Sequence, residues 1–531
     1  MLLTDALLLD YKRCPRRAFL NVYKNSEERD PERDFLLKLR QESHNHVVTV
    51  LAEFYPNYQK PQASHQDWEA RAKETEALMQ QGVECIYQGA LLLSDFQAWD
   101  LLSQVGVPTP SDPPPVNDKG DRIILLGTPH LLIKRPGISK FGNWWYSPVS
   151  IQLGRRPKPE YKLVAAFYAQ LLATMQGVFP TTSEVVLRRQ NRYTVDLLEW
   201  LPRMRETLKD AVQMLLVRRE PEVFISRQRC SLCHWYSHCY SLAQSQQHLS
   251  LVPGVTPNRY EYLQAMGVDS VASLADACPI NLGETMGREV AAQLKQQAQA
   301  IVEQRAIRKF NGFLDIRKTI PTAEIELYFD IEAEPERNLD YLLGLLLVDR
   351  QTNSKHFYPF LAEKPEDEGL IWQQFLAVVS AYDNAPIFHF SEYEVETIKR
   401  LANLYKTPRD RMESLISRCV DLHKRTISSV TFPVESYSLK ALANWIGFQW
   451  RDRGVSGDQC VCWYDRWLTT GDRTFLEAIL RYNEDDCRAT FHLKNWLVEF
   501  LVDGGIVLIW ALKSYKLGAS SFGRYTSYRR R

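Results

Sequence analysis

The chain has 531 residues, 45% of them hydrophobic and 24% charged, so it is long enough for two or three domains with their own cores. Its formal net charge of +1 excludes binding to nucleic acid through overall charge, and any basic binding surface must be local. No apolar run has the length of a membrane span, and the start lacks the charged-then-apolar order of a secretory signal peptide. We therefore expect a cytoplasmic protein without membrane contact, in which structural disulfides are unusual.

Residues 1–243 are predicted to form a domain of mixed helices and strands. One helix is expected from Pro159 to Gly177, because proline favours the first helical turn and glycine the position after the last. The other expected elements are helices at 15–25 and 34–55 and strands at 122–136 and 144–153, with a proline-rich loop at 105–121 before the strands.

Three cysteines with C-x2-C-x5-C spacing close this first domain, in the stretch RCSLCHWYSHC. A tetrahedral metal or cluster site needs four ligands, and Cys230, Cys233 and Cys239 supply three of them. His234 or His238 would complete a small local zinc site. On this interpretation the site needs no residue from elsewhere in the chain.

The same cysteines support a second interpretation. The segments DYKRCPRRAFL and CSLCHWYSHC bracket a domain that resembles the RecB-like nucleases with an iron–sulfur cluster, including the CRISPR-associated exonucleases. In that family one cysteine precedes the nuclease core and three follow it. The resemblance implies that Cys14 joins Cys230, Cys233 and Cys239 around a [4Fe–4S] cluster, with Zn²⁺ as the alternative. Such a site would tie the two ends of the domain together.

The resemblance also implies a restriction-endonuclease-like PD-(D/E)xK core between these cysteines. That core needs a histidine on an early helix, an aspartate ending one strand, and an acid and a lysine two residues apart on the next. His46 matches the histidine, but His130 stands at the aspartate position. Ser150 and Gln152 stand where the acid and the lysine belong. We interpret the domain as a nuclease fold with a degenerate catalytic core that serves as a nucleic-acid clamp.

Other residues of this domain leave alternatives open. Gln170 and Tyr168 lie near the position of the family's Gln/Tyr motif. If the alignment to the family's catalytic positions is shifted, Asp121, Glu160 and Lys162 are nearby residues that would serve instead, although they do not follow the order of acids and lysine along the strands that the core requires. An aromatic run would either stack on bases or belong to the core: Trp144, Trp145 and Tyr146.

Residues 244–317 are predicted to be helical. The stretch LVPGVTPNRYEYLQAMGVDSVASLA resembles a helix-hairpin-helix, with Gly254 in the hairpin. Backbone N–H groups in such a hairpin can bind a phosphate without reading sequence. A structural linker is the equally supported alternative.

Residues 318–531 alternate strands and helices, which predicts an α/β domain. In YFDIEAEP, Asp330 and Glu332 lie two apart in a strand and therefore on one face. Two carboxylates that converge there repel each other unless a divalent cation neutralises them. About 150 residues later, Tyr482 and Asp486 share one face of a predicted helix.

These residues resemble the DEDD exonucleases of the ribonuclease H-like fold that carry an active-site tyrosine. The segments FPVESYSLKALANWIGFQW and YNEDD further resemble the YprB-type ribonuclease H-like domain of some RecB-like bacterial proteins. The resemblance implies four carboxylates around two Mg²⁺ or Mn²⁺ ions, with Asp330, Glu332 and Asp486 as ligands and Tyr482 placing the attacking water. In IFHFSEYEVETIKRL, Glu394 follows the aromatic Tyr393 at the start of a predicted helix and is the candidate for the fourth ligand.

Glutamate at that fourth position departs from the family, which has aspartate there. Glu392 is a competing candidate, and Asp421 in RCVDLHKR is an acid near a strand end that could support the ligands. His389 is predicted to end the strand before Glu394.

The resulting hypothesis is a metal-dependent exonuclease that acts 3′→5′ on DNA or RNA, with a single-stranded end as substrate. The alternative is a non-catalytic DNA-binding or adaptor protein in repair or defence, built on two nuclease folds. A third arrangement would keep activity in the first domain. No G-x4-GK[ST] motif is present, so a helicase, if one is needed, would be a partner protein. The basic tail at 524–531 is expected to be a solvated end that can also touch nucleic acid.

Overall fold

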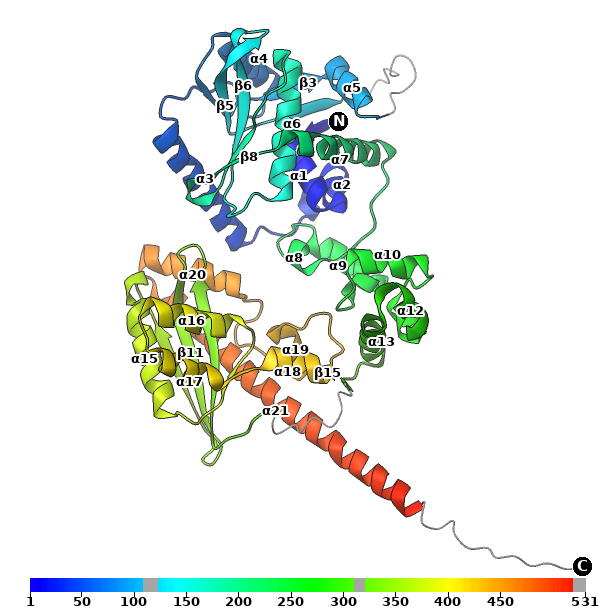
Figure 1. The fold of residues 1–531 in the computed structure, drawn as a ribbon, viewed down its shortest axis with the longest axis vertical. Coiled ribbons are helices and arrows are strands. Elements are labelled where there is room, and N and C mark those ends of the chain that lie inside the picture. Colours follow the sequence, from blue (N-terminus) through cyan, green and yellow to red (C-terminus); the bar gives the residue numbers. More distant parts are fainter. Residues whose placement is uncertain (108–122, 310–319, 519–531) are drawn as a thin grey trace, which may run out of the picture. The chain divides into compact units, whose positions relative to one another are not determined.

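The structure is a computed structural model that describes residues 1–107, 123–309 and 320–518, with side chains as far as Val502. Most of the predicted proline-rich loop at 105–121, Asp121 within it, and the basic tail at 524–531 lie outside the described residues. The chain divides into two compact units, Met1–Leu242 and Ala243–Arg531 (Figure 1). Among the described residues, no helix is both long enough and apolar enough to cross a bilayer.

The first unit combines helices with two small sheets. Its strands are β1 (Leu2–Thr4), β2 (Cys85–Tyr87), β3 (Leu91–Ser94), β4 (Ile124–Gly127), β5 (Leu131–Ser139), β6 (Gly142–Ile151), β7 (Glu184–Val186) and β8 (Arg192–Thr194). Its helices are α1 (Asp5–Arg13), α2 (Pro15–Tyr23), α3 (Asp34–Phe54), α4 (Trp68–Gln80), α5 (Asp95–Gln104), α6 (Pro159–Gln176), α7 (Leu197–Val217), α8 (Arg227–Cys230) and α9 (Tyr236–Ser245).

The five-stranded sheet of this unit has the order β2-β5-β6-β7-β8, and a three-stranded sheet has the order β1-β4-β3. Strands β6 and β7 are parallel, whereas β5 and β6 form a long antiparallel hairpin. Helix α6 packs on both sheets and is buried along most of its length. Pro159 occupies its first turn and Gly177 caps its end with φ 71°, which confirms the predicted bounds of this helix.

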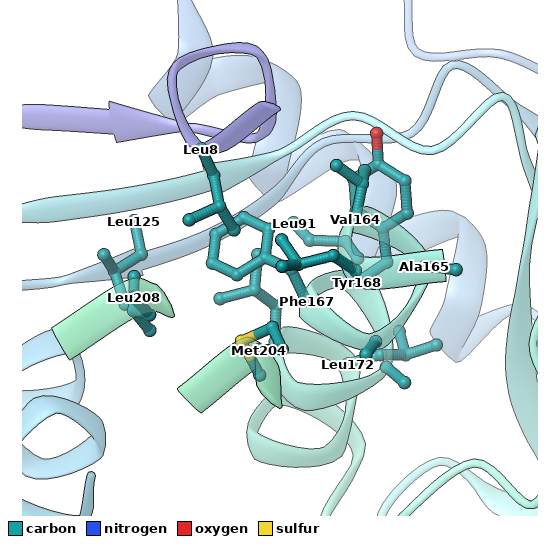
Figure 2. Close-up of a cluster of buried hydrophobic side chains, with 14 of the residues drawn as sticks. Leu8, Leu91, Leu125, Val164, Ala165, Phe167, Tyr168, Leu172, Met204 and Leu208 are labelled. Carbon is teal, nitrogen blue, oxygen red and sulfur yellow. The ribbon is translucent and has the colours of Figure 1, made fainter. Parts of the chain in front are cut away.

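The core of the first unit forms where α6 meets α1, α7 and the sheets. Phe167 of α6 lies among Leu8 of α1, Leu91 of β3 and Met204 of α7 (Figure 2). Tyr168 lies at the edge of this cluster, and its hydroxyl points away from the labelled apolar side chains (Figure 2). The apolar faces of these helices therefore pack against the sheets, as expected for a two-layer core.

The second unit begins with a helical segment and continues as an α/β domain. Its helices are α10 (Pro257–Ala265), α11 (Val271–Asp276), α12 (Pro279–Met286), α13 (Arg288–Glu303), α15 (Glu368–Ala381), α16 (Tyr393–Leu404), α17 (Arg409–Ser417), α18 (Leu422–Ser429), α19 (Leu439–Trp445), α20 (Gly457–Thr470) and α21 (Arg473–Gly518). Its strands are β9 (Ile307–Arg308), β10 (Ile325–Glu334), β11 (Leu339–Asp349), β12 (Ser354–Leu361), β13 (Ile387–His389), β14 (Cys419–Asp421) and β15 (Val430–Thr431).

The helical segment differs in one respect from the predicted hairpin. Gly254 has φ 93°, but the element before it is a 3₁₀ turn at Leu249–Leu251 and not an α-helix. The turn between the consecutive helices α10 and α11 instead contains Gly267, with φ 73°. A left-handed glycine therefore occurs at both positions, and the helix–turn–helix lies one element later than expected.

The five-stranded sheet of the second unit has the order β12-β11-β10-β13-β14, and β15 and β9 form a separate two-stranded sheet. Strands β10, β11 and β12 form an antiparallel meander, and β13 and β14 run parallel to β10. Strand β11 is buried over nearly its whole length, because helices cover both faces of the sheet. This order makes β10 the central strand, so side chains on it can meet residues from several other elements.

Helix α21, drawn in orange to red in Figure 1, packs on β10 and is held there by a buried ion cluster. Glu326 at the start of β10 is fully buried and accepts a hydrogen bond of 2.6 Å from Lys494 Nζ. Arg350 donates to the same carboxylate through Nε at 2.8 Å. Because slippage of α21 would leave these buried charges unpaired, the cluster specifies how α21 lies along β10.

Candidate metal centre

Three carboxylates meet where β10 and α21 pack together. Asp330 and Glu332 project from the same face of β10, and Asp486 projects from α21. One oxygen of each lies within 4.8 Å of one oxygen of the other two. Oxygen atoms at this spacing suit a hard divalent cation such as Mg²⁺ or Mn²⁺, and among the described residues this is the only such group of His, Cys, Asp or Glu donors.

The carboxylates are in an environment that disfavours their charges. Burial, and then the charges of Asp486 and Glu332, raise the pKa of Asp330 well above its usual range. Burial and then Asp486 raise the pKa of Glu332 in the same way. Burial raises the pKa of Asp486 to about 7. A bound divalent cation would replace this repulsion with attraction, which is the physical argument that the cluster fits a metal.

Two side chains fix the orientation of these carboxylates. Asn483 donates a hydrogen bond of 2.7 Å from Nδ2 to Oδ2 of Asp330, and Trp450 donates one of 2.7 Å from Nε1 to Oδ1 of Asp486. Asn483 is fully buried, and its Oδ1 has no hydrogen-bond partner. Gly344 pairs with Asp330 across β10 and β11, and a Cβ at 344 would overlap the Asn483 side chain. The glycine therefore makes the room in which Asn483 reaches Asp330.

Tyr482 and Lys440 line the Asp486 side of the cluster. Tyr482 is hydrogen-bonded to Asp486, and burial followed by the Asp486 charge raises the pKa of its hydroxyl. The Lys440 ammonium lies 4.9 Å from the centre of the Tyr482 ring and 5.6 Å from that of Trp450. It also bonds the backbone oxygen of Val455. A fixed positive charge thus stands beside Glu332 and Asp486, and it offsets part of the rise that burial causes in the pKa of both carboxyl groups.

The candidate for a fourth ligand is close but not within the three-carboxylate group. Glu394 lies buried in the first turn of α16 and adds to the raised pKa of Asp330, after burial and the other two carboxylates. It accepts a hydrogen bond of 2.8 Å from Ser391 Oγ, and its Oε2 is 3.6 Å from His389 Nδ1. Its other carboxylate oxygen, Oε1, is not engaged by Ser391.

Glu392, the competing candidate, and Asp421, the expected supporting acid, have other partners. Glu392 is exposed and forms an ion pair with Lys424. Asp421 caps α18 by accepting a hydrogen bond of 3.0 Å from the backbone N–H of Lys424. His389 is the last residue of β13, as predicted.

Sequence reasoning did not single out Asn483, Trp450 or Lys440. A signal for Asn483 existed, because it lies three residues before Asp486 and hence on the same helical face. Trp450 and Lys440 come from a different segment, and only the packing of α19 and the loop after it brings them to α21.

The four cysteines predicted as ligands lie together in the first unit. Cys14 stands between α1 and α2, and the other three come from α8, α9 and the turn between them. Burial raises the pKa of the Cys239 thiol to about 11, and Cys233 and Cys14 add to the effect, which shows their proximity. The backbone N–H of Ser226 donates to Cys230 Sγ at 3.3 Å, a bond that suits a thiolate ligand.

The histidines of the local zinc alternative have other surroundings. Nε2 of His234 lies 2.8 Å from Oδ1 of Asn21, an oxygen that also accepts from Trp235 Nε1 at 2.9 Å. Burial lowers the pKa of His234 to about 4. His238 packs edge-on against Trp235. Nε2 of His234 is thus already hydrogen-bonded, and Cys14 lies near Cys230 and Cys233.

The predicted degenerate core is only partly assembled. His130 accepts a hydrogen bond of 3.2 Å at Nδ1 from the backbone N–H of Ile151, and burial followed by the His46 charge lowers its pKa to about 4. His46 and His130 are therefore neighbours. Gln152 and His130 line one cavity, whereas Ser150 is buried in β6.

Gln170 points away from that cavity. Its Oε1 accepts hydrogen bonds of 2.8 and 3.1 Å from Arg205 of α7. Gln170 and Tyr168 lie two residues apart, which puts them on different faces of α6. Val164, four residues before Tyr168, shares the cavity with it.

Glu160 and Lys162, named as alternative catalytic residues of this domain, have other partners. Glu160 pairs with Arg13 at 3.7 Å, and Lys162 lies 4.9 Å from the Tyr193 ring. The aromatic run contributes to the fold, since each member donates a hydrogen bond to a backbone oxygen: Trp144 to Met79, Trp145 to Pro136 and Tyr146 to Val83.

A comparison with models of protein families gives a match in the second unit. The family model described as the RNase_H superfamily matches residues 327–498, a range that contains Asp330, Glu332, Glu394, Tyr482 and Asp486. No curated protein matches the chain. The C-terminal unit therefore contains a ribonuclease H-like domain, and the carboxylate cluster lies inside it.

Proposed function

We propose that the ribonuclease H-like domain is a metal-dependent nuclease that hydrolyses phosphodiester bonds at the cluster of Asp330, Glu332 and Asp486. One observation carries the proposal: three buried carboxylates from β10 and α21 converge within 4.8 Å of one another. Buried carboxylates with raised pKa values and no cation among them are costly, and they are retained where function needs them.

The residues divide into ligands and positioning groups. Asp330, Glu332 and Asp486, with Glu394 as the fourth carboxylate, would hold two Mg²⁺ or Mn²⁺ ions. Bound there, such ions generate a nucleophilic hydroxide from water and stabilise the leaving 3′ oxygen. Asn483 holds Asp330 in one orientation, and Trp450 does the same for Asp486.

Tyr482 is suited to orient the attacking water, because its hydroxyl already lies at the Asp486 carboxylate. The nearby Lys440 adds positive charge where the phosphate would bind. The tyrosine and the resemblance to DEDD exonucleases support exonuclease action in the 3′→5′ direction. Its substrate would be the single-stranded end of DNA or RNA.

The N-terminal unit would act as a clamp for nucleic acid that is stapled by an iron–sulfur cluster on Cys14, Cys230, Cys233 and Cys239. The thiols of these four cysteines influence one another's pKa values, which supports a single shared site. The resemblance to nucleases with one cysteine before the core and three after it supports [4Fe–4S], with Zn²⁺ as the alternative.

A nuclease assay on the full chain tests the proposal. With Mg²⁺ or Mn²⁺ and single-stranded DNA or RNA labelled at its 5′ end, we expect stepwise shortening from the 3′ end. Asp330→Asn and Asp486→Asn should abolish it, and Glu392→Gln, at an exposed carboxylate that pairs with Lys424, should leave it unchanged. Equal inactivity of the wild type and both variants would instead support the adaptor protein. Cleavage that survives in both variants would place the active site in the first unit.

A further inference from the structure

A cavity of about 350 Å³ opens in the first unit, where the starts of α1 and α4 approach the end of β6 and one face of α6. Its volume is in the range of ligand pockets, which is about 300–1,000 Å³. It contains His130 and Gln152, two of the positions at which the expected catalytic residues are replaced. The described donors around it do not form a metal-binding group. The chemistry of the cavity must therefore come from its other side chains.

A buried cation lines the cavity without a matching anion. Arg71 of α4 is only 3% exposed. Its guanidinium donates hydrogen bonds of 2.9 Å to the backbone oxygens of Ala63 and Gln88. In the part of the chain that the structure describes, no carboxylate forms an ion pair with it. A buried guanidinium in this state attracts an anion, and its planar N–H groups fit phosphate oxygens.

A carboxylate lines the cavity from another element and is not paired with Arg71. Asp5, in the first turn of α1, accepts hydrogen bonds from the hydroxyls of Tyr168 and Thr128, the latter at 3.2 Å. The Tyr168 hydroxyl leaves the apolar cluster to make this bond (Figure 2). Among the described residues Asp5 has no cationic partner. It can therefore accept a further hydrogen bond from an N–H donor of a ligand.

The remaining lining suits a flat heteroaromatic ring. The lining of the cavity includes the aromatic side chains of Trp68 and Tyr161, and Gln88 and Gln152, whose amides can both donate and accept hydrogen bonds. Stacking on aromatic side chains and hydrogen bonds to base edges are how proteins hold unpaired bases.

We propose that this cavity binds a nucleotide, with its phosphate on Arg71 and the amino group of its base on Asp5. The ligand is either a free nucleoside monophosphate or the phosphorylated end of a strand, since both carry the same chemistry. The proposal does not depend on nuclease activity in the C-terminal unit. It gives the first unit a ligand site at the cavity that contains His130 and Gln152.

Titration calorimetry of the full chain in EDTA tests the proposal, because without divalent metal the carboxylate cluster of the other unit is not engaged. The probes are AMP, CMP, UMP, adenosine, inorganic phosphate and a single-stranded oligonucleotide with or without a 5′-phosphate. We expect AMP to bind at least about tenfold more tightly than adenosine or phosphate alone. AMP and CMP should bind more tightly than UMP, whose base has no amino group. Tighter binding of the phosphorylated oligonucleotide than of AMP identifies a strand end as the ligand, and the reverse identifies the free nucleotide.

Variants separate the two ends of the site. Trp68→Ala should weaken AMP binding about tenfold or more, and Arg71→Gln should remove the advantage of AMP over adenosine. Asp5→Asn should remove the preference for AMP over UMP while the fold is kept, as circular dichroism would verify. Arg156→Gln, which removes the same charge at an exposed position, is the matched control and should change nothing. The proposal is overturned if the wild-type protein binds none of the nucleotides, or if Trp68→Ala and Asp5→Asn both bind like the wild type.

Discussion

Replacing Asp486 with asparagine should make the metal-free protein more stable while it removes nuclease activity. The pKa of Asp486 is raised from 3.8 to about 7 by burial. A raised pKa in the folded state means that the carboxyl group stabilises the fold fully below about pH 4. This contribution is lost as the pH rises through about 7. At pH 8 the cost of the ionised group is about 4 kcal/mol at most, from roughly 1.4 kcal/mol per pKa unit.

Asparagine has nearly the same shape and no charge, so Asp486→Asn should recover much of this free energy. Its side-chain oxygen can still accept the hydrogen bond from Trp450 Nε1. For a domain of this size, about 1 kcal/mol corresponds to a shift in Tm of roughly 2–4 °C. We therefore expect the Tm of the C-terminal unit to rise by several degrees in EDTA at pH 8.

The neighbouring residue provides a matched control. Asp485 is also buried, but its carboxylate accepts hydrogen bonds of 2.8 Å from Nε and from the backbone N–H of Arg451. Asp485→Asn removes a paired charge and should lower the Tm. The same chemical change at adjacent positions is thus expected to have opposite effects on stability.

Differential scanning calorimetry of the full chain measures both effects. The transition of the C-terminal unit is identified as the one that Mn²⁺ raises in the wild type, and Asp486→Asn should lose that response. If Asp486→Asn lowers the Tm in EDTA as much as Asp485→Asn does, the argument from a buried, unpaired charge is refuted.

Three further predictions concern the same sites. Asn483→Ala should reduce kcat/KM about 10- to 100-fold, because Asp330 loses the hydrogen bond that orients it, and unchanged activity would contradict this. The free energy of unfolding should change by no more than about 1 kcal/mol, because the substitution removes a hydrogen bond and an unpartnered buried oxygen together. The rise in Tm caused by Mn²⁺ should be larger at pH 8 than at pH 6, because Asp330 and Asp486, whose pKa values are raised, must lose protons to bind the metal. A rise in Tm that does not depend on pH would count against this prediction. The purified Cys14→Ser variant should contain no iron, whereas Cys278→Ser, a change at an exposed cysteine, should keep it. Iron retained in Cys14→Ser would exclude the four-cysteine site. Zinc in place of iron in the wild-type protein would exclude the cluster.

The parts of the site that follow from local periodicity could be anticipated from the sequence. Asp330 and Glu332 share a strand face by alternation, and Asp486 follows Tyr482 by one helical turn. The sequence could not show that the neighbouring Asp485 has a different role. That distinction depends on Arg451, which reaches α21 only through the fold.

Contacts between distant segments were the least predictable. The hydrogen bond between Asn483 and Asp330 joins residues 153 positions apart, and no periodic pattern relates them. Gln170 shows a different limit. Gln170 and Tyr168 lie close together in the sequence near the position of the Gln/Tyr motif, but a separation of two residues in a helix places their side chains on different faces. The mixed α/β character of the chain was easier to predict, since it depends on patterns repeated over many residues.

Gly344 and Asn483 also constrain how this domain can change over generations. A side chain at 344 overlaps the asparagine, so Gly344→Ala with Asn483 intact should be strongly unfavourable, and losing Asn483 first leaves Asp330 without its orienting partner. Replacing Gly344 alone therefore costs stability, and replacing Asn483 alone costs the orientation of Asp330. Among related sequences we expect the two to vary together, with a residue other than glycine at 344 occurring only where 483 is small and another donor holds the aspartate.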